Sequence, residues 1–212
     1  MIDIVTLKTA HLHGDALADQ HRFRYRQFIC RAGWVLPHVD DMEYDQFDTP
    51  AAVYLLWRDQ AARVRGMVRL LPTTRPYMTD TLWPELAPEE GLPRAESVWE
   101  NTRFAVDRDL PAPLRRTVTS ELVLGSLEFG LSRSIDRYLL ISPLWVLNGA
   151  LTAAGLPYRM LRQTDALGRW PVASAYVPVS AQILATARSC LGIEHSVCDF
   201  ADGCDRQPAR AA

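Results

Sequence analysis

The chain has 212 residues, of which 48% are hydrophobic and 23% charged. This length and composition suit one hydrophobic core and exclude disordered, collagen-like and low-complexity chains. The apolar runs are too short to span a bilayer, and the N-terminus, with Asp3 inside its first apolar run, does not resemble a secretory signal. A formal charge of −2 gives no bulk attraction to nucleic acid or membranes. We therefore expect a cytoplasmic protein with neither as a partner.

The pattern of apolar residues and turn signals predicts one domain over residues 1–192 and a poorly ordered tail over residues 193–212. The predicted elements of the first half are a strand at 1–7, a helix at 15–30, a long loop at 33–50, hairpin strands at 52–58 and 63–71, and a surface excursion at 72–95. Those of the second half are a strand at 97–106, helices at 111–134 and 145–154, strands at 137–142, 158–162 and 172–179, and a final helix capped by Ser180 and ended by Gly192. This order favours an α/β sandwich with helices over a mixed sheet.

Several familiar motifs are absent from the sequence. There is no P-loop, G-x-G-x-x-G, G-x-S-x-G or H-E-x-x-H motif, which disfavours nucleotide-fold and hydrolase functions. The four cysteines have no C-x-x-C spacing and no standard set of zinc-ligand partners. We therefore expect no metal.

Side chains that could carry chemistry gather between residues 24 and 103. Each has an ordinary explanation, since aromatic residues mainly fill cores and acids serve as turn residues or ion-pair partners. Glu100 is less ordinary, because a carboxylate between Trp99 and Phe104 is costly to bury unless it is paired or functional.

The joint spacing of these residues resembles the signature of the acyl-homoserine-lactone synthases, the quorum-sensing autoinducer synthases. Eight positions have the residue type and order of that family: Arg24, Phe28, Trp34, Asp45, Asp48, Arg69, Glu100 and Arg103. The resemblance implies a single-domain, three-layer α/β/α fold like that of the N-acetyltransferases. It also implies an acyltransferase that joins S-adenosylmethionine to an acyl thioester, closes the lactone and releases methylthioadenosine.

The resemblance implies two groups of site residues. Arg24, Phe28, Trp34 and Arg69 would bind S-adenosylmethionine, which is a substrate, so that no separate cofactor is expected; the catalytic residues would be Glu100, Arg103, Asp45 and Asp48. Aromatic faces suit a sulfonium and an adenine, and an arginine fork suits the ligand carboxylate, with Arg24 and Arg103 as equal candidates. The attacking amine must lose a proton, for which Glu100 is the candidate general base.

The spacing of Glu100 and Arg103 raises a geometric difficulty. Residues three apart on a regular strand point to opposite faces of the sheet, so both can reach one site only if the strand is irregular. We therefore predict a bulge or bend between them.

The acyl group requires an apolar tunnel, for which the candidates are Ser142, Leu144 and Trp145, with ordinary core packing as the alternative. Trp145 is large enough to shorten this tunnel and to favour a short, branched or aromatic acyl group. The donor could be acyl-coenzyme A or an acyl carrier protein. Residues 43–56 resemble the subgroup of the family that takes branched or aryl acyl-coenzyme A.

Two other functions compete with lactone synthesis. An N-acetyltransferase using acetyl-coenzyme A would share the fold, but the sequence has no Gly-rich pyrophosphate loop before the helix at 111–134. A non-catalytic module that binds a small ligand is the third possibility, and the intact site residues argue against it.

Overall fold

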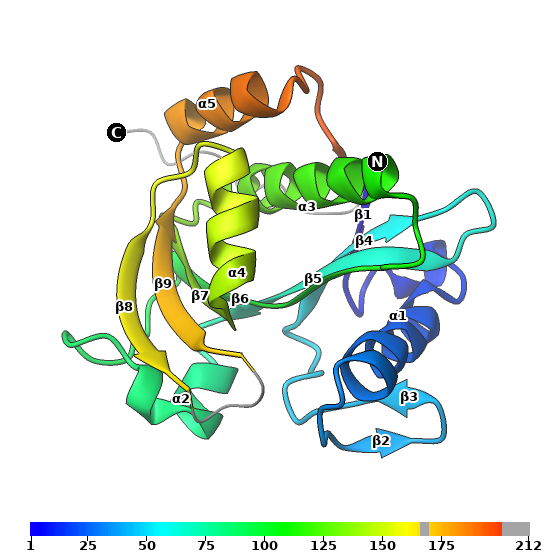
Figure 1. Cartoon of the computed structure of the whole chain (residues 1–212), viewed down its shortest axis with the longest axis horizontal. Helices are drawn as coiled ribbons and strands as arrows, with labels where there is room; N and C mark the ends of the chain where they lie inside the picture. Colours follow the sequence, from blue (N-terminus) through cyan, green and yellow to red (C-terminus); the bar gives the residue numbers. More distant parts are fainter. Residues whose placement is uncertain (166–169, 201–212) are drawn as a thin grey trace.

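The computed structural model describes residues 1–165 and 170–200, and its centre is a mixed sheet of eight strands (Figure 1). The strand order is β10-β1-β4-β5-β6-β7-β9-β8, and neighbours are antiparallel except for the parallel pairs β1–β10 and β6–β7. The bounds are β1 (Ile2–Val5), β4 (Val53–Arg58), β5 (Val64–Pro72), β6 (Val98–Val106), β7 (Arg137–Pro143), β8 (Arg159–Thr164), β9 (Val172–Pro178) and β10 (Cys198–Asp199).

Helices cover both faces of this sheet. One face carries α3 (Ala112–Ser132) and α5 (Ala181–Leu191), and the other carries α1 (Ala16–Arg24) and α2 (Met78–Leu82) (Figure 1). The side chains of β4 alternate between the two resulting cores: Leu55 packs with α3, Leu56 packs with α1, and neither is exposed. The predicted three-layer α/β/α sandwich with a mixed sheet is thus confirmed.

Local sequence signals explain where the last helix begins and ends. The Ser180 hydroxyl accepts a hydrogen bond from the backbone N–H of Ile183, and Gly192 adopts the left-handed conformation at the C-terminus of α5. On β5, a Cβ at Gly66 would lie 2.5 Å from a methyl carbon of Val118, so glycine allows α3 to pack closely on the sheet.

The helices that flank the cavity described below differ from the predicted ones. The helix predicted at 15–30 is α1 followed by a π-helix, η2 (Tyr25–Arg31), and the helix predicted at 145–154 is a single turn, α4 (Leu144–Val146), followed by the π-helix η4 (Leu147–Leu151). π-Helical turns concentrate at functional sites.

Two segments that were predicted to be irregular contain short helices and strands. The loop at 33–50 holds a small hairpin, β2 (His38–Val39) and β3 (Met42–Glu43), and the excursion at 72–95 holds α2 and the 3-10 turn η3 (Pro84–Leu86). Another 3-10 turn, η1 (Ala10–Leu12), precedes α1. The excursion is not purely a surface feature, because Met78 is buried in the core beneath α1.

The segment after α5 is ordered as far as β10, in contrast to the predicted tail. Val197 and Cys198 are buried, and their backbone N–H groups donate to the carboxylate of Glu128 on α3 at 3.0–3.1 Å. Arg188 pairs with the same carboxylate at 2.8 Å. The buried Glu128 carboxylate therefore anchors the segment that ends in β10. The spacing of apolar residues in the sequence does not predict this contact. Residues 201–212 of the predicted tail lie outside the described residues.

Candidate active site

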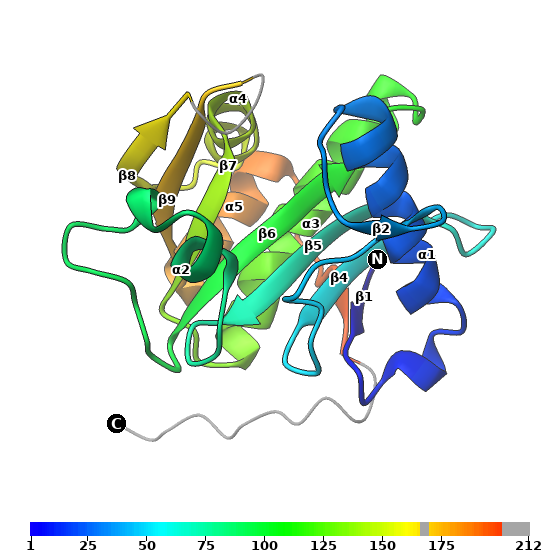
Figure 2. The same ribbon diagram turned by 90° about the horizontal axis from the view of Figure 1, so that it is seen from below.

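A cavity of about 1070 Å³ opens where β6 and β7 separate. The two strands pair only from Val98 to Asn101 against Arg137 to Leu140, although both continue beyond these residues (Figure 2). Their unpaired ends, including Arg103 and Ser142, line the cavity. The separation of two parallel neighbours therefore makes an opening in the sheet.

The cavity has a charged, aromatic part and an apolar part. The first is lined by residues that include Phe28, Trp34, Tyr44, Asp45, Met78 and Arg103, and the second by residues that include Val123, Leu127, Leu147, Ala150, Leu151 and Val177. Met78 belongs to the core beneath α1, whereas Leu127 and Val177 belong to the core beneath α3. The cavity thus reaches from one face of the sheet to the other.

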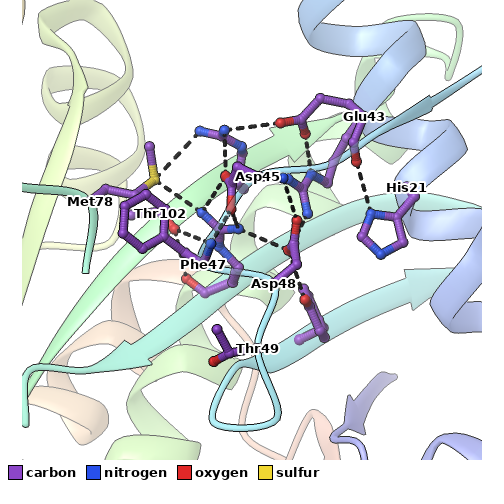
Figure 3. Close-up of polar contacts among 12 residues, drawn as sticks. His21, Glu43, Asp45, Phe47, Asp48, Thr49, Met78 and Thr102 are labelled. Atoms are coloured by element: carbon purple, nitrogen blue, oxygen red, sulfur yellow. Dashed lines mark hydrogen bonds and ion pairs between the residues drawn. The ribbon is translucent and has the colours of Figure 1, made fainter. Parts of the chain in front are cut away.

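A cluster of three arginines and three acids adjoins the charged part of the cavity (Figure 3). Arg69 donates to Asp45 at 2.6 and 2.9 Å and to Asp48 at 2.9 Å. Arg24 contacts Asp48 at 2.6 Å and also pairs with Glu43. Each carboxylate contacts two or more guanidiniums, so the cluster balances its own charge.

The cluster also controls the ionisation of its members. Burial alone would raise the pKa values of Asp45 and Asp48, but the neighbouring guanidiniums lower both: Arg69 above all lowers the pKa of Asp45, and Arg24 above all holds that of Asp48 well below its usual range. Burial similarly opposes the charge of Arg24, yet its acidic partners raise its pKa. Asp45 and Asp48 therefore remain ionised at neutral pH.

The cavity wall separates the predicted ligand-binding arginines. Arg24 and Arg69 are fully buried and lie outside the set of described residues that line the cavity, as does Asp48. Arg103 and Asp45 are on the wall. Arg103 donates to Asp45 at 2.7 Å and to Glu43 at 3.1 Å, while its Nε has no hydrogen-bond partner among the described residues. Of the two arginines considered for the ligand carboxylate, Arg103 lines the cavity and Arg24 does not.

The predicted irregularity between Glu100 and Arg103 is present. The register of β6 against β5 moves from Thr102–Arg69 to Ala105–Met67, which leaves an extra residue on β6. Arg103 has a φ of 56°, a conformation that non-glycine residues seldom adopt. This bulge turns Arg103 to the same face as Thr102, whose hydroxyl accepts from Arg69.

Glu100 occupies a different place from the one expected for a general base. Its carboxylate is fully buried, lies outside the set of described residues that line the cavity, and accepts from the Met78 N–H at 2.9 Å, the Thr79 N–H at 2.8 Å and the Thr79 hydroxyl at 2.5 Å. Burial raises its pKa, against the effect of these bonds. Both carboxylate oxygens thus bind the start of α2, so the structure ties Glu100 to that helix.

The two aromatic residues predicted to bind S-adenosylmethionine lie against each other in the structure. The rings of Phe28 and Trp34 stack with centroids 5.3 Å apart, and both line the cavity. The π-helix that carries Phe28 is tied to the end of β6, because Gln27 and Arg31 both contact the buried carboxylate of Asp107 at 3.5 Å. Asp107 thus links the π-helix that carries Phe28 to the end of β6.

The predicted acyl-pocket residues are divided. Ser142 lines the cavity, whereas Leu144 and Trp145 line a separate hollow outside it, where Trp145 is 53% exposed. On the following helical turns, Leu147 and Ala150 face the cavity instead. The structure therefore does not bring Trp145 to the place where it would limit acyl length.

Two residues of the site were not predicted. Glu43 is fully buried and bridges Arg24 and Arg103, and the Met78 sulfur lies 3.0 Å from a guanidinium nitrogen of Arg69. Glu43 could have been identified, because residues two apart on an extended segment share a face and Asp45 follows at that spacing. Met78 has no comparable signal.

The described residues contain no group of three or more His, Cys, Asp or Glu side chains placed to hold a metal ion. Within the same part of the chain, no helix is long and apolar enough to cross a membrane.

The known proteins to which this chain is similar in sequence include several homoserine-lactone synthases. An acyl-homoserine-lactone synthase of Ralstonia solanacearum is 42% identical over 94 residues, which are 43% of this chain and 46% of the relative. The match to that relative thus spans about half of its length. An isovaleryl-homoserine lactone synthase of Bradyrhizobium diazoefficiens is 32% identical over 166 residues, or 74% of this chain and 73% of the relative.

Solved structures agree with the fold. A CoA-dependent acyl-homoserine lactone synthase, solved with MTA, has a TM-score of 0.83 at 28% identity and covers 94% of this chain and 92% of its own. An N-acetyltransferase from Lactobacillus plantarum has a TM-score of 0.55 at 16% identity, covering 84% of this chain and 99% of its own, a likeness of fold alone. The family model described as autoinducer synthase matches residues 9–185. This chain belongs to the autoinducer synthase family.

Proposed function

We propose that this protein is an acyltransferase that makes an N-acyl-L-homoserine lactone from S-adenosylmethionine and an acyl thioester. The observation that carries this proposal is the single cavity that joins a charged, aromatic part to an apolar part across the sheet. Its volume of about 1070 Å³ is slightly above the ~300–1,000 Å³ usual for small-molecule sites. A charged substrate and an apolar acyl group can therefore meet in this cavity.

S-adenosylmethionine suits the charged, aromatic part. Trp34 and Phe28 offer faces for adenine and the sulfonium, and Arg103 offers an incompletely paired guanidinium for the carboxylate. Asp45 is the one acid among the described residues that line the cavity, and its ionised form attracts the cationic ligand. In this proposal, Arg24, Arg69 and Asp48 hold Arg103 and Asp45 in place from behind the wall.

The chemistry follows from this arrangement. The ligand's amine, in its neutral form, attacks the thioester carbonyl and forms the amide, and the sulfur leaves as a thiol that carries the proton lost by the amine. The ligand's carboxylate then attacks its own γ-carbon, which closes the lactone and expels methylthioadenosine. The second step needs mainly orientation, because both reacting groups belong to one molecule. Glu100 acts as a positioning residue, since it fixes the start of α2 and thereby Met78 on the cavity wall.

The apolar part disfavours an ordinary acetyltransferase. An acetyl group would leave most of the space among Leu147, Ala150, Leu151 and Val177 unfilled. A larger acyl group, with Ser142 near its path, uses this space. A binding module without catalysis would have no need for an opening that joins both faces of the sheet.

Incubation of the purified protein with S-adenosylmethionine and parallel sets of acyl-coenzyme A and acyl-carrier-protein donors tests the proposal. Mass spectrometry should find lactone and methylthioadenosine in equal amounts. Consumption of acetyl-coenzyme A with another amine acceptor would support an acetyltransferase instead, and binding of S-adenosylmethionine without turnover would support the binding module. The proposed cytoplasmic location is tested by cell fractionation.

A further inference from the structure

Tyr44 is a further aromatic side chain on the wall of the charged part of the cavity. It stands between Glu43 and Asp45 in the sequence, lines the cavity and is 36% exposed. Its hydroxyl donates to the Met42 sulfur at 3.6 Å, and a thioether is a weak acceptor. The Tyr44 side chain therefore offers the cavity an accessible ring and a weakly engaged hydroxyl.

His21, on α1, holds Tyr44 by two contacts. The centroids of the His21 and Tyr44 rings lie 4.2 Å apart, and Nδ1 of His21 lies 2.9 Å from the backbone carbonyl oxygen of Glu43 (Figure 3). Because a carbonyl oxygen can only accept a hydrogen bond, Nδ1 carries the proton. His21 is buried, and burial above all lowers its pKa. The ring that supports Tyr44 is therefore uncharged at neutral pH.

The Phe28 ring, in contrast, already has a protein cation beside it. Phe28 stacks on Trp34, and the Arg103 guanidinium lies over the Phe28 ring. A positive ligand group at that ring would be repelled by this guanidinium. Among the described residues, no guanidinium lies over the ring of Tyr44. A positive group can therefore lie against Tyr44, next to the carboxylate of Asp45 on the same wall.

We propose that Tyr44 is a further ligand-binding residue whose ring contacts the sulfonium of S-adenosylmethionine, and that His21 is the residue that positions it. The inference rests on the proposed function. A cationic group is attracted to the face of an aromatic ring, whereas the neutral thioether of methylthioadenosine lacks this attraction. Tyr44 thereby favours the substrate over the nucleoside product that must leave the cavity.

Two ligands that differ in the charge at sulfur test the role of Tyr44. S-adenosylmethionine and S-adenosylhomocysteine, its neutral thioether analogue, are each titrated into the full chain, and binding is followed by calorimetry. Tyr44→Leu should weaken binding of S-adenosylmethionine about fivefold and leave that of S-adenosylhomocysteine nearly unchanged, whereas Tyr44→Phe should keep the discrimination. Retained binding of the thioether also shows that the variant is folded. An equal loss for both ligands in Tyr44→Leu would overturn the proposal.

A second Tyr–His ring pair supplies the matched control. Tyr25 follows α1 by one residue, and its ring lies 5.3 Å from that of His38 on β2. Both residues lie outside the set of described residues that line the cavity. Tyr25→Leu should therefore change the affinity for neither ligand, and a loss of discrimination in this variant would count against the assignment to Tyr44.

Variants of His21 test the positioning role. His21→Ala should lower the ratio of the two affinities as Tyr44→Leu does, and the double variant should lower it no further, because His21 acts through Tyr44. His21→Asn keeps an N–H group near the place of Nδ1, and His21→Phe keeps a ring against Tyr44, so each should retain part of the ratio. Additive effects in the double variant would overturn the role of His21.

Turnover separates this inference from the proposed function. If the unchanged protein forms lactone while Tyr44→Leu keeps the full ratio of affinities, the role of Tyr44 is wrong and the proposed function stands. If the unchanged protein forms no lactone from any donor and binds neither ligand, both are wrong.

Discussion

The guanidinium of Arg103 lies 5.5 Å from the centroid of the Phe28 ring, so the bulge on β6 and the π-helix η2 meet at the cavity wall. Both are local departures from regular backbone geometry. A regular β6 would point Arg103 to the opposite face, away from Asp45 and Glu43. The charged part of the cavity therefore depends on two backbone irregularities at once.

Two replacements of Arg103 should separate the free-energy cost of its positive φ from the contribution of its side chain to ligand binding. Arg103→Gly and Arg103→Ala both remove one guanidinium partner from Glu43 and from Asp45 and take the cation from the cavity wall, so each should weaken S-adenosylmethionine binding at least tenfold. The glycine variant should be about 1 kcal/mol more stable to urea than the alanine variant, because φ is positive at this position. Equal stability of the two variants would contradict the strained bulge.

The acidic cluster should make the protein sensitive to acid. The pKa of Asp48 is depressed in the folded state, so its contribution is complete above the unfolded value of ~4 and is lost as the pH falls below it. Asp48→Asn should lower the free energy of unfolding at pH 7 by about 3 kcal/mol and flatten its decline in acid. Urea unfolding between pH 7 and pH 3 measures both effects. Asp80→Asn, which breaks the surface pair with Arg94, should cost less than about 1 kcal/mol.

Glu100 offers a test between a base and a positioning residue. Glu100→Gln replaces one acceptor with an NH₂ group, which opposes a backbone N–H at the start of α2. We expect a higher KM for S-adenosylmethionine, with Thr79→Ala, which removes one hydrogen bond to the same carboxylate, moving KM in the same direction. An unchanged KM with abolished turnover in Glu100→Gln, together with a fully active Thr79→Ala, would restore the role of general base.

Asp107 should set the position of Phe28 without touching the ligand. Asp107→Asn weakens the contacts to Gln27 and Arg31 and should raise KM for S-adenosylmethionine several-fold, with a shift in the fluorescence of Trp34 on ligand addition. Asp109 pairs with the same Arg31 at 2.6 Å but is 72% exposed, so Asp109→Asn is the matched control and should be nearly neutral. Equal effects of the two changes would remove the positioning role.

The apolar part of the cavity should set acyl length through Ala150. Ala150→Phe adds a ring to the cavity wall and should lower kcat/KM for long acyl donors at least tenfold, while short donors are little affected. Trp145→Ala should leave the preference for acyl length unchanged, because Trp145 lies outside the cavity. A general loss of activity in Ala150→Phe with all donors would contradict this division.

Some features of the fold and of the cavity can be predicted from the sequence, and others cannot. The bulge at Arg103 is predictable, because the side-chain period of a strand conflicts with the spacing from Glu100. The orientation of residues 144–151 is not, since Leu144, Trp145, Val146 and Leu147 are all apolar and either helix face suits a core. The sequence also does not show how deeply a site residue is buried. Nothing in it distinguishes Arg24, which is buried behind the cavity wall, from Arg103, which lines the cavity.

The hydrogen bonds that anchor Val197 and Cys198 to Glu128 also affect the first strand of the chain. β10 is only two residues long, yet it pairs with Ile2 and Asp3 and thereby covers the free edge of β1. A protein shortened to end before Val197 would expose the backbone N–H and C=O groups of that strand beside the apolar Ile2 side chain. Exposed strand edges of this kind recruit other chains, so such a truncation would cause aggregation rather than a simple loss of activity.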